Sequence, residues 1–160
     1  SAMPAGAALL SPLADLTLSD PGVEARAGRD PMVRASWLRQ AQAAYACPPD
    51  APEHRPLHTG LAGLPPLLVQ VGADEILLGD AQALAAQARA CGVACRLEVF
   101  EGRWHVFQLQ AAQLHGARSA IDGLAAFVRE KIAASAGGEE GVQTADRPGA
   151  RDEARALATP

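Results

Sequence analysis

Two stretches of sequence decide the fold: LeuLeuValGlnValGlyAlaAspGlu (67–75) and LeuGluValPheGluGlyArgTrpHisValPheGln (97–108). Each is a short apolar run followed by a turn, and the turns hold Asp74 and His105. Apolar runs of this length are typical of buried strands in a parallel sheet. Neighbouring strands lie about 4.8 Å apart, so we expect the two side chains to meet at one sheet edge. An Asp that orients a His forms two members of a nucleophilic triad.

The rest of the chain alternates strand and helix patterns around these two runs. We predict strands at 5–10, 67–71 and 96–100, and helices at about 35–45, 77–91 and 115–134. This order predicts an α/β fold: a partial doubly wound parallel sheet of about three strands with flanking helices. We expect residues 1–135 to form one folded segment. Residues 136–160, rich in Gly and charge, are predicted to be a disordered polar tail.

Several local patterns refine these elements. Gly92 occupies the position after the 77–91 helix where a left-handed residue is favoured. Trp37 and Tyr45 recur at helical spacing, which favours core packing over a substrate-binding role. Asp15 is expected to form an Asx turn, and Asp80 is expected to begin a helix or to pair with a cation. Glu75, next to Asp74, is the alternative carboxylate for orienting His105.

Composition excludes several classes of function. The formal charge of −4 and the pI near 5.5 argue against a nucleic-acid partner. No apolar stretch approaches the roughly 20 residues of a membrane span, and no basic region at the start indicates a signal peptide. Position 1 is Ser, which favours a segment of a longer protein. Three cysteines are too few for a disulfide framework and favour reduced thiols in a cytoplasmic protein.

Candidate metal and cofactor motifs are weak. Cys91 and Cys95 are separated by Gly92, where the pattern changes from helix to strand. His54 and His58 lie among prolines, so they do not share a helix face. The glycine-rich segment 137–141 has no preceding strand and no following Lys, so it does not predict a phosphate loop. We therefore predict no metal site and no cofactor.

Four pieces of the sequence together resemble one family. They are LeuLeuSerProLeuAlaAspLeuThr (9–17), ArgAspProMet (29–32), LeuAlaGlyLeuProProLeuLeuValGlnValGlyAlaAspGluIleLeuLeu (61–78) and TrpHisValPheGln (104–108). In this order they resemble the C-terminal part of the hormone-sensitive-lipase-like carboxylesterases of the α/β-hydrolase superfamily. The resemblance covers roughly residues 5–132.

The resemblance implies a triad whose members follow the order Ser, Asp, His along the chain. It places the acid on Asp74 and the base on His105, and it implies hydrolysis of a small acyl ester. Trp104, Val106 and Phe107 are weak candidates for substrate contact. No Gly-x-Ser-x-Gly occurs in the sequence, so no nucleophile is predicted in this chain. Ser11 matches the family's structural Ser-Pro after a strand.

Two functions therefore remain open at the level of sequence. The first is the C-terminal segment of a serine esterase that carries the acid and the base but is inactive alone. Its partner is then the missing N-terminal half or a second copy in a homo-oligomer. The second is a non-catalytic α/β remnant that binds a partner through its open sheet edge.

Overall fold

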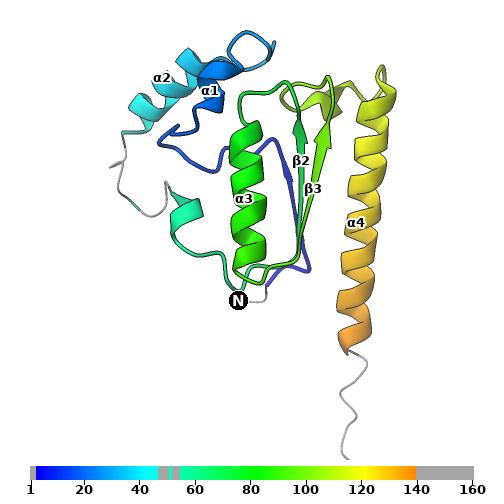
Figure 1. Cartoon of the computed structure of the whole chain (residues 1–160). Coiled ribbons are helices and arrows are strands. Elements are labelled where there is room, and N and C mark those ends of the chain that lie inside the picture. The colour runs from blue at the N-terminus through cyan, green and yellow to red at the C-terminus, as the bar shows by residue number, and fades with distance from the viewer. Residues whose placement is uncertain (1–2, 47–50, 52–54, 140–160) are drawn as a thin grey trace, which may run out of the picture.

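A three-stranded parallel sheet forms the centre of the molecule. The computed structural model describes residues 3–46, 51 and 55–139. The strands β1 (Ala7–Leu10), β2 (Leu67–Gly72) and β3 (Cys95–Phe100) lie in the order β1-β2-β3 (Figure 1). Leu67 of β2 lies opposite Ala7 of β1 and Cys95 of β3. This confirms the predicted α/β class with three parallel strands.

Helices cover the two faces of this sheet. The helices are α1 (Gly22–Ala25), α2 (Ala35–Tyr45), α3 (Leu78–Ala90) and α4 (His115–Glu139), with short 3-10 turns η2 (Pro56–His58) and η3 (Phe107–Gln110). Figure 1 shows α3 on one side of the strands and the long α4 on the other, with α1 and α2 beyond the ends at which β2 and β3 finish. Among the described helices, none is long and apolar enough to cross a membrane.

The central strand β2 is buried along its whole length because both of its faces are covered. Alternate side chains of β2, among them Val69 and Val71, pack with Ala81 and Leu84 of α3 in the main core cluster. Gln70 points to the other face, where its Nε2 donates a hydrogen bond to the carbonyl oxygen of Ala120 in α4 at 2.8 Å. This polar contact fixes α4 against the sheet.

The described helix boundaries follow the predictions closely except at the chain's end. Helix α2 spans the predicted residues, and Gly92 after α3 has a φ of +76°, which is the left-handed conformation expected there. Helix α4 continues to Glu139, so the predicted tail is wrong for residues 136–139. Alanines before this point have high helix propensity, which lets the helix run through Gly137. The other predicted tail residues, 140–160, lie outside the described part of the chain.

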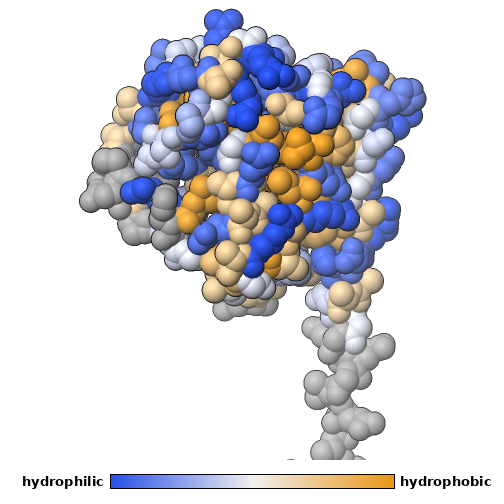
Figure 2. Space-filling model, viewed as in Figure 1, coloured by the Kyte–Doolittle hydropathy of each residue, from blue (hydrophilic) through white to orange (hydrophobic). Residues whose placement is uncertain are grey.

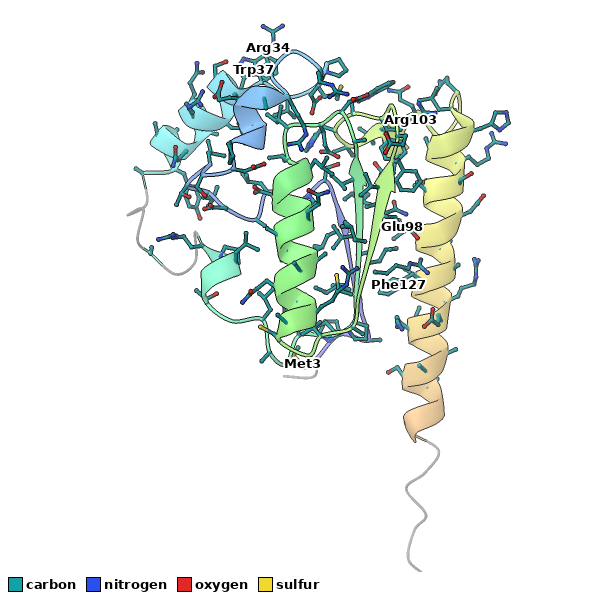
Figure 3. All side chains as sticks on the ribbon, viewed as in Figure 1. Met3, Arg34, Trp37, Glu98, Arg103 and Phe127 are labelled. Atoms are coloured by element: carbon teal, nitrogen blue, oxygen red, sulfur yellow. The ribbon has the colours of Figure 1, made fainter. Side chains whose placement is uncertain are left out.

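Some apolar residues that the sequence assigned to the core are exposed instead. Trp37 and Tyr45 are 53 % and 68 % exposed, so the core-packing prediction is wrong for both. Figure 3 shows Trp37 near Arg34, whose guanidinium carbon lies 5.3 Å from the centre of a Trp37 ring.

On α4 the buried residues include Ala117 and Phe127. Hydrophobic side chains also reach the surface between α3 and α4 (Figure 2), where β3 forms the sheet edge.

Candidate functional site

The site lies where the three strands end, because each strand leads into a loop that contributes one polar side chain to it. Ser11 follows β1, Glu75 follows β2 after a short turn, and His105 follows β3. Parallel strands place their carboxyl ends at one sheet edge, which is the usual ligand-binding edge of open α/β sheets. Glu75 and His105 follow Ser11 by 64 and 94 positions in the sequence, and the three residues meet at this edge.

Glu75 and His105 form a direct pair. The Nδ1 atom of His105 lies 3.1 Å from Oε2 of Glu75. Glu75 is fully buried, whereas the side chain of His105 is 22 % exposed. The other oxygen of Glu75, Oε1, accepts hydrogen bonds from the Ser11 hydroxyl at 3.0 Å and from the Gly72 amide. The carboxylate is thus held by three donors, and one of them is the imidazole.

Asp74, the predicted partner of His105, takes a different position. Its carboxylate forms an ion pair with Arg29, and its side chain remains 27 % exposed. The backbone amide of Asp74 donates to the Arg103 carbonyl at 2.9 Å, and the turn that follows directs Glu75 into the interior. The structure therefore corrects the predicted orienting residue, because Glu75 and not Asp74 contacts the imidazole.

The close approach of two loops makes this pairing possible. A Cβ atom on Gly72 would lie 2.2 Å from the Arg103 carbonyl oxygen, closer than any real Cβ contact. Next to this crossing, the Ala73 amide donates to the Phe100 carbonyl at 2.9 Å. The loop after β2 and the loop after β3 are thus joined backbone to backbone just before Glu75 and His105. Only glycine allows this separation at position 72.

Ser11 links all three strand ends. Besides donating to Glu75, its Oγ accepts a hydrogen bond from the Val106 amide at 3.1 Å. Ser11 is 4 % exposed, and both it and Val106 have a φ of +50°. That conformation is uncommon for residues other than glycine. Sequence reasoning treated Ser11 as structural and missed this contact with the acid, although the Ser-Pro pair after a strand marked the position.

Replacement of Ser11 by Ala should loosen the loop that carries His105. The change leaves the Val106 amide without its acceptor and Glu75 without one donor, so we expect a loss of about 1–3 kcal/mol in unfolding free energy. Amide hydrogen exchange at Val106 should accelerate as well. Chemical denaturation and exchange measured by NMR check both results.

Two further variants define what the Ser11 result means. Ser36→Ala changes an exposed serine of α2 and should leave both measurements unchanged. Ser11→Gly relieves the left-handed backbone but also lacks the hydroxyl, so it should show the same fast exchange at Val106. Unchanged protection of Val106 in Ser11→Ala would show that the hydroxyl does not hold the loop.

The predicted substrate contacts divide into core and site residues. Phe107 is fully buried and packs against Phe100, with ring centres 4.9 Å apart, so its position is that of a core residue. Trp104 packs against the same small cluster and is only partly buried. Val106 contributes its backbone amide to Ser11. Of the three, Trp104 and Val106 keep side-chain surface next to His105.

The acidic residues near the start of α3 have a structural role. Asp15 forms the expected Asx turn, in which its Oδ1 accepts from the Thr17 amide at 2.9 Å. Burial raises the pKa of Asp15, but hydrogen bonds from Ser19 and Thr17 outweigh burial, and the net pKa is lowered. Asp80 binds the backbone amides of Ala14 and Asp15. Neither carboxylate contacts Glu75 or His105 among the described interactions.

A second buried carboxylate lies beside the Glu75–His105 pair. Asp30, in the loop before α2, is 5 % exposed. One of its carboxylate oxygens, one of Glu75 and a ring nitrogen of His105 all lie within 4.8 Å of one another. The sequence predicted no metal site, and Asp30 was visible only as part of ArgAspProMet (29–32). It is a member of the site that sequence reasoning missed.

Comparison with known proteins gives a consistent result. The family model described as alpha/beta hydrolase fold matches residues 1–109. The chain is 35 % identical over 130 residues to an acetyl-hydrolase of Streptomyces hygroscopicus, covering 79 % of this chain and 43 % of that protein. It is 34 % identical over 128 residues to an esterase of Acinetobacter venetianus, covering 78 % of this chain and 42 % of the relative.

Solved structures agree with the sequence relatives. An esterase from the bacterial hormone-sensitive lipase family superimposes with a TM-score of 0.79 at 39 % identity, covering 82 % of this chain and 45 % of that one. The chain spans less than half the length of the relatives it matches. The family match covers more than half of the present chain and includes all three strand ends of the site. The chain therefore belongs to the α/β-hydrolase fold family, within its hormone-sensitive-lipase-like branch of esterases.

Proposed function

We propose that this chain is the C-terminal segment of a serine carboxylesterase and supplies the acid and the base of the catalytic triad. The single observation that carries the proposal is the 3.1 Å contact between His105 Nδ1 and the buried carboxylate of Glu75. A carboxylate on Nδ1 fixes the tautomer in which Nε2 is free to accept a proton. The relatives named esterase and acetyl-hydrolase support a small acyl ester as substrate.

In the complete enzyme, His105 removes the proton from the serine hydroxyl as that hydroxyl attacks the ester carbonyl. The imidazolium then donates the proton to the leaving alcohol, and in the second half of the reaction it activates water in the same way. Glu75 stabilises the imidazolium. The serine and the oxyanion donors come from residues outside these 160, in a preceding segment or in another chain.

The chain by itself should therefore show no hydrolysis of p-nitrophenyl butyrate above background. Joined in frame after the N-terminal part of a related esterase, it should restore hydrolysis. In that chimera, Glu75→Gln should reduce kcat by about three to four orders of magnitude, while Asp74→Asn should change kcat little. Equal losses in the two variants, or turnover by the chain alone that disappears in His105→Ala, would contradict the proposal.

The pairing can also be tested without activity. In imidazole NMR of the full chain, the Nδ1–H proton of His105 should resonate far downfield because it bonds to a carboxylate. Glu75→Gln should move this signal upfield, because hydrogen bonds to charged groups are about twice as strong as neutral ones. Asp74→Asn is the matched control and should leave the signal in place.

A non-catalytic role as a partner-binding module is the second candidate. Within the described residues, β1 and β3 each have one unpaired edge, which another chain can extend. Self-association through β1, measured by sedimentation, supports this second candidate, and a stable monomeric chain counts against it. The cytoplasmic location and the oligomeric state stay predictions.

A further inference from the structure

The environment of Asp30 differs from that of an ordinary structural carboxylate. Its Oδ1 accepts hydrogen bonds from the amides of Met32 at 2.8 Å and Val33 at 3.2 Å. Its Oδ2 is buried and has no hydrogen-bond partner among the described residues. An unsatisfied buried carboxylate oxygen is unfavourable. Asp30 therefore presents one oxygen that is available to a further group.

The charges around this oxygen favour a cation. Asp30 and Glu75 are 5 % and 0 % exposed, and one oxygen of each lies within 4.8 Å of the other and of a His105 ring nitrogen. Among the described interactions, Arg29 pairs with Asp74, and Arg103 donates to the Gly102 carbonyl. Two buried carboxylates this close together are stabilised by a positive ion placed between them.

We propose that Asp30, Glu75 and His105 form a binding site for a zinc ion. Two carboxylates and one imidazole are ligands that zinc accepts, and three protein ligands plus one open position are typical of zinc sites that exchange a bound water. The imidazole disfavours magnesium and calcium, which prefer oxygen ligands alone.

The existing geometry needs little adjustment to accept the ion. Bond lengths of about 2.0–2.2 Å place neighbouring ligands of a tetrahedral zinc ion roughly 3.4 Å apart. His105 Nδ1 and Glu75 Oε2 are already 3.1 Å apart. One Asp30 carboxylate oxygen lies within 4.8 Å of a Glu75 oxygen and of a His105 ring nitrogen. This oxygen needs to move by no more than roughly 1.4 Å to reach the spacing of zinc ligands. Zinc takes the place of the proton on Nδ1, and that proton moves to Nε2, so the imidazole stays neutral when it binds the ion.

Zinc binding and general-base catalysis exclude each other at this site. An ion on Nδ1 removes the hydrogen bond that fixes the imidazole against Glu75, so zinc acts as a reversible inhibitor of the complete enzyme. This consequence rests on the proposed function. The binding itself rests only on the positions of the three side chains, and Asp30 has no part in the proposed triad.

Calorimetric titration of the full chain with zinc chloride, after dialysis against a chelator, tests the site. We expect saturable 1:1 binding that is weakened at least about tenfold in Asp30→Asn, with no loss in Asp74→Asn. Asn keeps the Oδ1 acceptor that Met32 and Val33 use, so the variant preserves the local fold. To remove competing thiols, all proteins in the titration carry Ser at three positions: Cys47, Cys91 and Cys95.

A spectroscopic readout identifies the ligand independently of the variants. Zinc should abolish the downfield Nδ1–H signal of His105 in proportion to the ion added, while the signals of exposed His115 stay unchanged. Absence of saturable binding, binding that survives Asp30→Asn, or a persistent Nδ1–H signal in the zinc-saturated chain would each overturn the site. The chain can fail to bind zinc while Glu75→Gln still moves the Nδ1–H signal of His105 upfield. That result overturns the zinc site and leaves the proposed function standing.

Discussion

Gly72→Ala should destabilise the chain by at least about 3 kcal/mol, at the upper end of what overpacking usually produces. The added Cβ would meet the carbonyl oxygen of Arg103 at 2.2 Å and its carbonyl carbon at 2.6 Å. Both atoms belong to the backbone, so no side-chain rotation can relieve the overlap. The two loops must separate, and the hydrogen bonds that Ala73 and Asp74 make across them must lengthen or break.

The same change should disrupt the site before it unfolds the sheet. Glu75 and His105 lie directly after the crossing, so we expect the Nδ1–H signal of His105 to weaken and the Asp74 amide to exchange faster. Urea denaturation and hydrogen exchange measure the two effects. Gly123→Ala is the matched control: its nearest neighbour is 3.6 Å away, an ordinary contact, and alanine favours the α4 helix by about 1 kcal/mol. A Gly72→Ala chain as stable as wild type would show that the loops can separate freely.

The fold was predictable because its elements follow local rules. Apolar runs of five or six residues gave the strands, and alanine-rich segments with Gly92 as a stop gave α3 within one residue at each end. The end of α4 was not predictable from composition, because the glycines at 137 and 138 and the charges after them read as a polar tail. Helix propensity that has built up over many residues carries through such weak positions.

The position of the site at the sheet edge was predictable, but the carboxylate that contacts His105 was not. The loops after β2 and β3 bring a carboxylate and an imidazole together at one sheet edge, which is the place that the sequence predicted. Whether Asp74 or Glu75 reaches His105 depends on the direction of a single turn, and that turn is set by the contact between Gly72 and Arg103. Contacts between residues 30 positions apart leave no periodic pattern. Asp30 and Ser11 are similar cases, because each reaches the site from a different loop.

Asp80→Ala should also reduce the unfolding free energy by about 3 kcal/mol, for a different physical reason. Oδ2 of Asp80 accepts hydrogen bonds from the amides of Ala14 at 2.8 Å and Asp15 at 2.9 Å, and the residue is 3 % exposed. Removal of the carboxylate leaves two buried amides without an acceptor, and each lost partner costs about 1–3 kcal/mol. These amides lie in the loop after β1, so the loss should also release Ser11. Asp122→Ala, on the exposed face of α4, should change stability by less than about 0.5 kcal/mol.

The pH dependence separates the charge of Asp80 from its role as an acceptor. Burial raises the pKa of Asp80, hydrogen bonds from the Asp15 and Ala14 amides oppose this, and the carboxylates of Asp15 and Asp20 raise it further, so the net pKa lies above its usual 3.8. The folded chain therefore holds this proton more tightly than the unfolded chain. The stability that protonation of Asp80 contributes is fully present below pH 3.8. It is lost as the pH rises through the higher pKa of the folded chain.

Asp80→Asn keeps an oxygen acceptor for the two amides and removes the titration. The difference in unfolding free energy between Asp80→Asn and wild type should therefore shift in favour of Asn as the pH rises from below 3.8 through the raised pKa, and it should be constant above that range. Denaturation of both chains at a series of pH values measures this difference. A difference that is flat across the acidic range would mean that the burial of Asp80 is offset completely by its two amide donors. In that case the penalty in Asp80→Ala arises from the unsatisfied amides alone.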